Sequence, residues 1–545
     1  MMETIETDVI IVGGGPTGLS LACQLVRYGI DFVVVEKNEG VTRFSKALGV
    51  QARTLEIYEQ MGLAAPAVER GAVAGKFRML AGGRVRGEIP LSDIGRGLTP
   101  YPYMLLLEQS KNEELLYEYL LSHEKQVLWK TELESFSQDE SKVTARVKRE
   151  DGQSQTITAQ YMVGCDGAKS PVRHGLGLTF EGSTFERLFY VVDARVDWEL
   201  PHDAVQICLA REVFTAFFPM KGEERYRIIG TFPEGANKEG GEVVYDEIER
   251  QIKREAKLRL EISEVNWFSL YKVHSRRVNK FSEGRCFVAG DAAHIHSPAG
   301  AQGMNTGIQD AYNLAWKLAF VIKGYAGERL LETYNEERLE NAKRLLETTD
   351  RFFEFAAGSN WLLSLIRTTV FPRVAGQIVN LGAVRKRIFP LVSQIGINYR
   401  DASLSDAGGD GGRFKVKPGD RMPYVWSEGR SVYDQLREPK FHLLVFSAGE
   451  GRHWRMADEL EEEYAPRLDC QILPLDPYVE KIFGAGKSFC VLLRPDNHVG
   501  FISAEISPER VRAYLKRAFV SSPEGKQSGG NPEFSVEVVE SYEHG

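Results

Sequence analysis

Residues Gly290–Asn305, with the sequence GDAAHIHSPAGAQGMN, bring one aspartate and two histidines together with a loop of small residues. Asp291, His294 and His296 are of types that bind zinc, but a metal site needs three or four side chains that converge on one point. The chain has no CxxC pair and no further ligand cluster to complete such a set. The alternative roles of the two histidines are packing and loop hydrogen bonds. An aspartate before a glycine-rich helix start suits a polyhydroxyl chain and an electron-rich ring.

A second group of residues suited to cofactor binding lies near the N-terminus. Gly13, Gly15 and Gly18 form a GxGxxG pattern after an apolar run, and Glu36 ends the next apolar run. In such a turn the first glycine permits a tight bend, the second lets the backbone approach a pyrophosphate, and the third lets the helix pack on the strand. The helix start faces the phosphates, and the acid can accept hydrogen bonds from ribose hydroxyls. The pattern predicts a dinucleotide site.

A third candidate is the segment QYMVGCDGAKSPVRHGLG, in which an apolar run leads to Asp166 and a glycine. Ser170, followed by a proline, is a good helix start, because serine caps the first turn and proline fits its first position. Arg173 then lies in that turn. The alternative interpretation is a surface turn with an exposed arginine.

Regular elements position all three groups at the ends of strands. Near the N-terminus the pattern predicts a strand at 8–12, a helix at 16–28 and a strand at 32–36, which together form a βαβ unit. Strands also precede Asp166 and Asp291. Apolar residues recur on one face of the segment at 307–324, which predicts an amphipathic helix after the small-residue loop.

Two further regions have strand patterns. Residues 178–275 alternate between apolar and polar types, which predicts a sheet that covers the ligand. Its segment VFTAFFPM supplies four candidates for a substrate pocket: Phe214, Phe217, Phe218 and Met220. The alternative for these four is ordinary core on one sheet face. After Pro418 we expect a separate αβ unit, with strands near 441–447 and 489–493.

Composition argues against several classes of partner. Of the 545 residues, 43% are hydrophobic and 26% charged, and the formal charge of -8 provides no basic footprint for nucleic acid. No uncharged apolar run approaches the roughly 20 residues that span a bilayer. The most apolar region, 361–397, contains arginines and lysine, so it predicts packed helices, with a peripheral membrane surface as the alternative. The six scattered cysteines fit a reducing cytoplasm.

In this order and at these separations, the motifs GGGPTG with Glu36, GCDGAKSPVR and GRCFVAGDAAHIHSPAGAQGMN resemble the class A flavoprotein monooxygenases of the p-hydroxybenzoate hydroxylase fold. The chain looks most like the branch that includes phenol hydroxylases and aromatic polyketide hydroxylases. The resemblance implies an α/β fold with four consecutive parts: a Rossmann-type FAD-binding domain (GR2) at 1–177, an inserted β-sheet substrate domain at 178–275, the second part of the FAD-binding domain at 276–400, and a C-terminal thioredoxin-like domain without CxxC at 415–545.

The same resemblance implies which residues contact FAD. The expected cofactor-binding residues are Gly13, Gly15, Pro16, Thr17, Gly18, Glu36, Lys37, Arg53, Gln109, Asp166, Gly290, Asp291, Pro298, Gly303, Met304 and Asn305. Pro298 and Gly300 would lie against the flavin ring, where catalysis takes place. His274 would be a structural hydrogen-bond donor or a proton relay. Backbone N–H groups at the start of the helix near Gly303 could stabilise the negative charge of a reduced flavin.

The implied reaction uses FAD, O2 and either NADPH or NADH. In this class the nicotinamide reduces FAD, O2 adds at flavin C4a, and the hydroperoxide hydroxylates an activated aromatic small molecule, so no Ser/His/Asp set is required. The alternatives are a Baeyer–Villiger or dehalogenating oxygenation on the same fold and a non-catalytic flavin-fold binding protein. The absence of a redox CxxC argues against a disulfide reductase. We expect neither a nucleic-acid partner nor an integral membrane segment, and a homodimer is left open.

Overall fold

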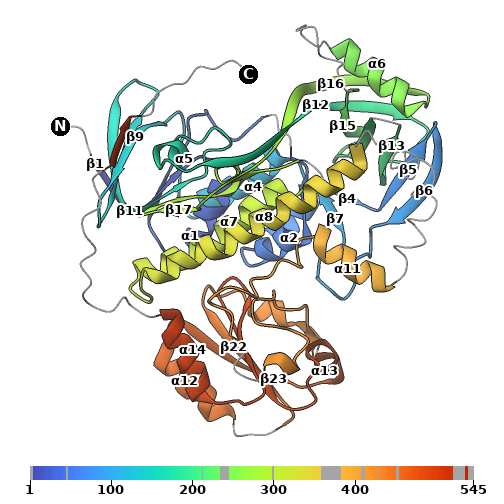
Figure 1. Cartoon of the computed structure of the whole chain (residues 1–545). Coiled ribbons are helices and arrows are strands. Elements are labelled where there is room, and N and C mark those ends of the chain that lie inside the picture. The colour runs from blue at the N-terminus through green and yellow to red at the C-terminus, as the bar shows by residue number, and fades with distance from the viewer. Residues whose placement is uncertain are drawn as a thin grey trace.

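The computed structural model describes residues 4–43, 47–210, 213–233, 245–297, 300–357, 382–406, 411–427, 429–449, 453–519 and 534–537. Figure 1 shows two large sheets with long helices packed between and against them, and a smaller unit formed by the C-terminal part of the chain. We call the larger sheet the parallel sheet, the other the outer sheet, and the smaller unit, with described residues between 411 and 519, the C-terminal unit.

The parallel sheet carries strands β1, β2, β11 and β18, which run parallel to one another. Val9, Ile10 and Ile11 of β1 are completely buried, and such an unbroken apolar run is typical of a parallel strand covered on both faces. The strands of this sheet are β1 (Thr4–Val12), β2 (Phe32–Val35), β8 (Val127–Leu128), β9 (Glu132–Gln138), β10 (Val143–Lys148), β11 (Ser154–Gly164), β17 (Ser282–Glu283), β18 (Cys286–Val288) and β26 (Phe534–Glu537).

Helices α1 and α7 pack side by side against the parallel sheet. The helix predicted at 16–28 has these same bounds in α1, whereas the helix predicted at 307–324 begins four residues earlier, at Gly303. All of α7 from Asn305 to Phe320 is buried. The helices of this part are α1 (Pro16–Tyr28), α2 (Ala52–Glu59), α3 (Ala64–Arg70), α4 (Gln109–Ser122), α5 (Pro171–Gly175), α7 (Gly303–Ile322), α8 (Arg329–Ala357) and α11 (Gly382–Val392).

Strands β12 and β16 are the longest strands of the outer sheet. Each has 19 residues, and they pair along nearly their whole length, from Phe180 opposite Val278 to Trp198 opposite Leu260. Helix α6 (Tyr245–Ala256) covers one face (Figure 1). The strands are β5 (Lys76–Ala81), β6 (Arg84–Pro90), β12 (Phe180–Trp198), β13 (Ala204–Leu209), β14 (Phe214–Pro219), β15 (Arg225–Thr231), β16 (Leu260–Val278) and β19 (His294–Ile295).

The outer sheet therefore extends beyond the range 178–275 that alternation predicted. Strand β5 pairs in parallel with β13, and β6 pairs with β5, so a hairpin from the first hundred residues completes the sheet. Alternation within a sequence identifies strands but not which distant strands pair. The proposed limits of the individual domains stay predictions.

The C-terminal unit has the thioredoxin-like arrangement. Its sheet has the order β23-β22-β24-β25, with β22 parallel to β23 and the other neighbours antiparallel. All six cysteines of the chain are free, and Cys470 and Cys490 lie on strands on opposite sides of β22. The elements are β22 (Phe441–Ser447), α12 (His453–Tyr464), β23 (Leu468–Pro474), α13 (Pro477–Phe483), β24 (Phe489–Leu493), β25 (Val499–Ser503) and α14 (Pro508–Phe519).

Two small sheets complete the described chain. They contain β3 (Gly49–Val50), β4 (Ala72–Ala74) and β7 (Met104–Leu106), and β20 (Trp426–Ser427) with β21 (Arg430–Ser431). Much of the apolar region at 361–397 lies outside the described residues, although α11 shows that part of it is helical, as predicted. Among the helices described, none is long and apolar enough to cross a membrane.

Replacing Leu443 by alanine should destabilise the C-terminal unit. Leu443 is completely buried on the central strand β22, and a cavity at such a position costs about 2–5 kcal/mol. The same change at Leu121, which is 46% exposed on α4, should alter the thermal unfolding midpoint little. Equal midpoints for the two variants, measured by thermal denaturation, would contradict this packing.

Candidate functional site

Four parallel strands end together at one edge of the parallel sheet. In register, Val12 of β1 lies opposite both Val35 of β2 and Gly164 of β11, and Gly164 lies opposite Val288 of β18. Because each of the three predicted motifs follows one of these strand ends, the register brings all three to the same place. Ligands of open α/β sheets bind at this edge.

The glycine turn after β1 leaves no room for side chains at two of its positions. Gly13 has φ +109, and a Cβ there would lie 2.3 Å from the carbonyl oxygen of Cys165. A Cβ on Gly18 would lie 1.9 Å from the oxygen of Gly13. Gly15, the N-cap of α1, instead has nothing within 4 Å of its Cβ position, and Pro16 begins the helix. The N-terminus of α1 thus faces open space that suits a phosphate group.

Glu36 lies directly beside this turn, as predicted for an acid at the end of the second strand. Its carboxylate accepts hydrogen bonds from the N–H groups of Gly14 (2.7 Å) and Asn38 (2.9 Å). The side chain is half-buried, whereas Lys37 is exposed. A ribose at this point would share the carboxylate with the backbone of the turn.

Asp166 lies at the end of the neighbouring strand with one carboxylate oxygen bonded and one unpaired. Its Oδ2 accepts from the N–H of Val172 at 3.0 Å, and its Oδ1 has no partner among the described residues. Burial raises the pKa of Asp166 to about 6. Ser170 caps α5, as predicted, by accepting from the N–H of Arg173. Arg173 is buried and donates to the carbonyl of Ala292, so the alternative of an exposed arginine is wrong.

The segment after β18 packs tightly on the first glycine turn. A Cβ on Gly290, which has φ +61, would lie 2.4 Å from Oγ1 of Thr17, and a Cβ on Gly307 would lie 2.3 Å from the same atom. Thr17 therefore fills the contact between α1 and α7. Asp291, in the short 3-10 turn Gly290–Ala292, is exposed at this edge.

The two histidines of this segment have different partners. His294 is buried, and its Nε2 lies 2.7 Å from Oδ2 of Asp310, which also accepts from the N–H of Gly290. Arg338 donates to the other oxygen of Asp310 at 2.6 Å. His296 instead bonds through Nδ1 to the carbonyl of Ser297. Burial lowers the pKa of His296 to about 4, so this imidazole is neutral at pH 7.

The side chain of Asn305 links the loop before α7 to the residues around β3 and α2. Asn305 Oδ1 accepts from the N–H of Gln51 and from Oγ1 of Thr54, and Nδ2 donates to the carbonyls of Gly49 and Ala301, all at 2.8–2.9 Å. Ala301, at φ +52, is in the left-handed region, as is Gly300. The predicted contact Pro298 lies outside the described residues.

The start of α7 offers a set of backbone donors. No acceptor for the N–H groups of Gly303, Met304 and Asn305 is found within the part of the chain that the structure describes. Together with the helix dipole they favour negative charge in front of the helix.

These residues fit a dinucleotide with a polyhydroxyl chain. The buried atoms Asp166 Oδ1, His296 Nε2 and Ser297 Oγ lack partners among the described residues, and buried polar atoms in a folded protein are normally satisfied. The open position at Gly15 and the donors of α7 add an anion site and a place for an electron-rich ring. The arrangement can hold FAD, whose chemistry is oxidation and reduction.

Two further predicted cofactor residues have protein partners in the structure. Arg53 is buried on α2 and donates to Glu56 (3.2 Å) and to the carbonyl of Asp496 (2.9 Å). Gln109, at the start of α4, donates to Glu113 at 2.8 Å. A flavin contact for either side chain stays a prediction.

The four candidate pocket residues lie on opposite faces of the outer sheet. Phe214, Phe218 and Met220 share one face, whereas Phe217 is completely buried on the other, with its ring 4.5 Å from that of Trp198 beneath α6. The idea that all four line one pocket is therefore wrong, because successive side chains of a strand point to opposite faces. Phe217 is a core residue. His274 is exposed on β16, where Nδ1 lies 2.8 Å from Oγ1 of Thr184.

A buried ion pair that the sequence did not predict lies on the face of Phe218. Arg227 of β15 donates twice to Asp193 of β12, at 2.7 and 2.6 Å, and once to the carbonyl of Ala47. Since Ala47 leads into β3, whose Gly49 lies against Ala301, this face of the sheet is turned toward the loop before α7. The signal available in the sequence for this ion pair was a charged residue, Asp193 or Arg227, at a core position in each of two alternating segments.

Known proteins are similar to this chain in sequence and in fold. Residues 6–349 match the family described as an FAD binding domain. The chain is 31% identical to 6-methylpretetramide 4-monooxygenase of Streptomyces rimosus, over 97% of both chains, and 29% identical to pentachlorophenol 4-monooxygenase of Sphingobium chlorophenolicum, over 91% of this chain and 94% of that one. The solved structure of an anhydrotetracycline hydroxylase from Streptomyces rimosus superposes with a TM-score of 0.74 at 27% identity, and covers 94% of this chain and 99% of its own.

The raised pKa of Asp166 predicts a pH-dependent effect of Asp166→Asn on the FAD-free protein. The folded state keeps the proton up to about pH 6, whereas the unfolded chain releases it near pH 4, so stability from this group is present below pH 4 and is lost as the pH rises through 6. The variant should match the natural protein near pH 4 and exceed its stability at pH 7, by at most about 3 kcal/mol.

Thermal denaturation across this pH range measures the difference. Asp139→Asn is the matched control, because hydrogen bonds from Ser141 lower the pKa of the exposed Asp139, and this change should not stabilise the protein at neutral pH. A stability difference for Asp166→Asn that is the same at pH 4 and pH 7 would count against a buried, proton-holding carboxyl.

Proposed function

The chain belongs to the FAD-binding-domain family of flavin-dependent aromatic monooxygenases, and from this premise we propose that it hydroxylates a phenolic or polyketide-type small molecule at the edge of the parallel sheet. The reaction uses FAD, O2 and NADPH or NADH. The proposed site has the adenosine half of FAD on the glycine turn and Glu36, and the flavin ring against the loop that leads from Gly300 to Asn305.

One observation carries this proposal. The in-register ends of β1, β11 and β18 bring the glycine turn, Asp166 and Asp291 together from positions more than a hundred residues apart. No packing requirement alone calls for unpaired buried polar atoms and an open helix N-terminus at the same edge. A dinucleotide uses both.

FAD, when bound, takes reducing equivalents from the nicotinamide and delivers an oxygen atom of O2 to the substrate. The chain's own residues position the reacting partners. We infer that the N–H groups of Gly303, Met304 and Asn305 stabilise negative charge at the ring. His296 is neutral at pH 7 and contributes no positive charge, so these backbone donors supply the stabilisation. We infer that the outer sheet, one face of which is turned toward the loop before α7, excludes water from the flavin ring, as this chemistry requires.

The outer sheet supports an aromatic substrate with polar substituents. On the face turned toward the loop, Phe214 packs near the ring of Phe189, and Phe218 lies among apolar neighbours. The Arg227–Asp193 pair adds charge to this apolar face. The names of relatives, which include a pentachlorophenol and an anhydrotetracycline enzyme, agree with a ring system that carries hydroxyl groups.

We also propose a cytoplasmic enzyme, supported by six free cysteines.

A substrate panel tests the proposed reaction. NAD(P)H consumption by the FAD-loaded protein should be stimulated by one class of compounds, from simple phenols to polycyclic quinones, without equivalent release of H2O2. Product analysis by mass spectrometry should show the gain of one oxygen atom. If every compound left the slow basal rate unchanged, hydroxylation of this substrate class would be ruled out.

Asp291→Ala should abolish or strongly weaken FAD binding, because the carboxylate is proposed to hold the ribityl chain. We expect a colourless protein or a dissociation constant raised at least about tenfold, which corresponds to about 1.4 kcal/mol. Asp401→Ala, with a side chain 86% exposed outside the proposed site, is the control. Full flavin occupancy of the Asp291 variant would refute this role.

A further inference from the structure

Helix α2 connects the loop before α7 with the C-terminal unit. On the loop side, the Gln51 N–H and the Thr54 hydroxyl both donate to Asn305, and Gln51 Nε2 donates to the carbonyl of Gly300 at 2.9 Å. These bonds come from the N-cap and the first turn of α2. A shift of the helix along its axis would therefore move Gly300 and Asn305 with it.

On its other side α2 is held by the C-terminal unit. Arg421 donates to Glu56 at 3.0 Å and to the carbonyls of Leu98 and Ile395 at 3.0 and 3.1 Å. The side chain of Glu56 is completely buried and that of Arg421 is 7% exposed. Arg53 adds its bond to the Asp496 carbonyl. Both ends of this link are thus made by fixed, desolvated groups.

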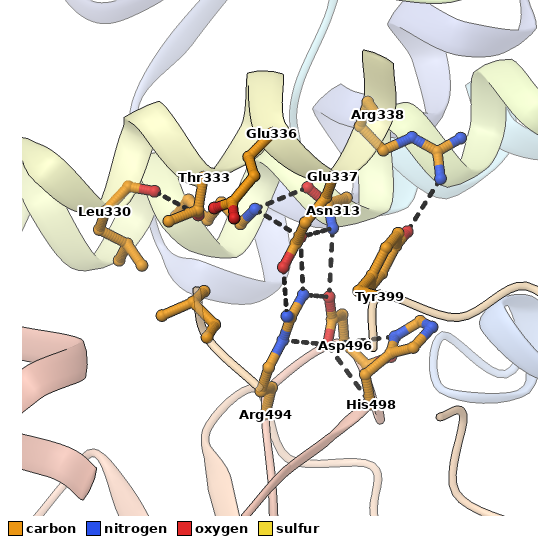
Figure 2. Close-up of polar contacts among 12 residues, drawn as sticks. Asn313, Leu330, Thr333, Glu336, Glu337, Arg338, Tyr399, Arg494, Asp496 and His498 are labelled. Carbon is orange, nitrogen blue, oxygen red and sulfur yellow. Dashed lines mark hydrogen bonds and ion pairs between the residues drawn. The ribbon is translucent and has the colours of Figure 1, made fainter. Parts of the chain in front are cut away.

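A second link runs through the helix α8 and is drawn in Figure 2. Arg494 of the C-terminal unit contacts Glu337 of α8 and Asp496 of its own loop, and all three side chains are at most 1% exposed. Burial alone would raise the pKa of Glu337, but the positive charges of Arg494 and Lys317 hold it at about 2. Removing one partner of such a pair leaves an uncompensated buried charge, so separating the C-terminal unit from α8 would be strongly unfavourable.

This second link ends at Gly290, which precedes the loop that α2 contacts. The ring of His498 lies 4.5 Å from that of Tyr399, whose hydroxyl accepts from Arg338 at 2.8 Å. Arg338 donates to Asp310, and Asp310 accepts from the N–H of Gly290. The C-terminal unit therefore reaches Gly290 by one route and Gly300–Asn305 by the other.

We propose that the C-terminal unit, which has no redox motif, positions the flavin-facing residues 290–297 and 300–305, with Arg421 as the positioning residue that acts through Glu56 and α2. This inference rests on the proposed placement of the flavin at those residues. The described partners of Arg421 are protein groups, and in this proposal it acts by setting the position of the loop and of the α7 backbone donors.

The test compares Arg421→Lys with Arg437→Lys. Both arginines belong to the C-terminal unit and both pair with an acid of α2, but Arg437 is 51% exposed and pairs with Glu59. Lysine keeps the charge and loses the planar fork that bonds two carbonyls and a carboxylate at once. Leu443→Ala is the second control, because it destabilises the unit without touching α2.

We expect Arg421→Lys to change the visible absorption band of bound flavin, to weaken FAD binding about tenfold, and to raise the fraction of NAD(P)H that ends as H2O2 about twofold or more. Arg437→Lys and folded Leu443→Ala should keep the natural spectrum and H2O2 fraction. An Arg421→Lys protein with an unchanged spectrum and H2O2 fraction would overturn the inference, as would identical changes in Leu443→Ala. Failure of the natural protein itself to bind FAD would refute the proposed function instead.

Discussion

The register of four parallel strands is the constraint on which the site depends. A slip of one residue between β1 and β11 would turn their buried side chains to the wrong faces, and it would also separate the turn at Gly13 from the carbonyl of Cys165 that it touches. The contacts that define the glycine turn thus belong to the sheet as much as to the motif. Hydrophobic burial on both faces stabilises this register, and the polar edge is the part left free for a ligand.

Local patterns in the sequence predicted the elements near the site well. The βαβ unit, the Ser170 cap and the strands before Asp166 and Asp291 depend on short-range chemistry: turn glycines, capping side chains and unbroken apolar runs. The resemblance to flavoprotein monooxygenases added the fold and the cofactor. Both kinds of information concern residues close together in the chain or matched to a known motif.

Long-range pairing could not be predicted in the same way. Nothing near residue 80 indicates that β5 pairs with β13, and alternation puts Phe217 and Phe218 on opposite faces without telling which face is turned toward the loop before α7. The partners of Arg53 and of Asp310 are distant in sequence as well, since Asp496 and Arg338 come from other elements. Buried charges satisfy one another across the fold, so a single charged residue in a sequence does not reveal its partner.

The length of β12 and β16 has a consequence for how such enzymes can diversify. At roughly 3.3 Å per residue, each 19-residue strand is on the order of 60 Å long. One end pairs beside His294 and the other supports the outer sheet. The two strands stay paired along this length through two register shifts, so the outer sheet and the end beside His294 belong to one continuous strand pair. Recombination between relatives would have to preserve the pairing register of both strands over their whole length, including the buried pair of Asp193 on β12 with Arg227.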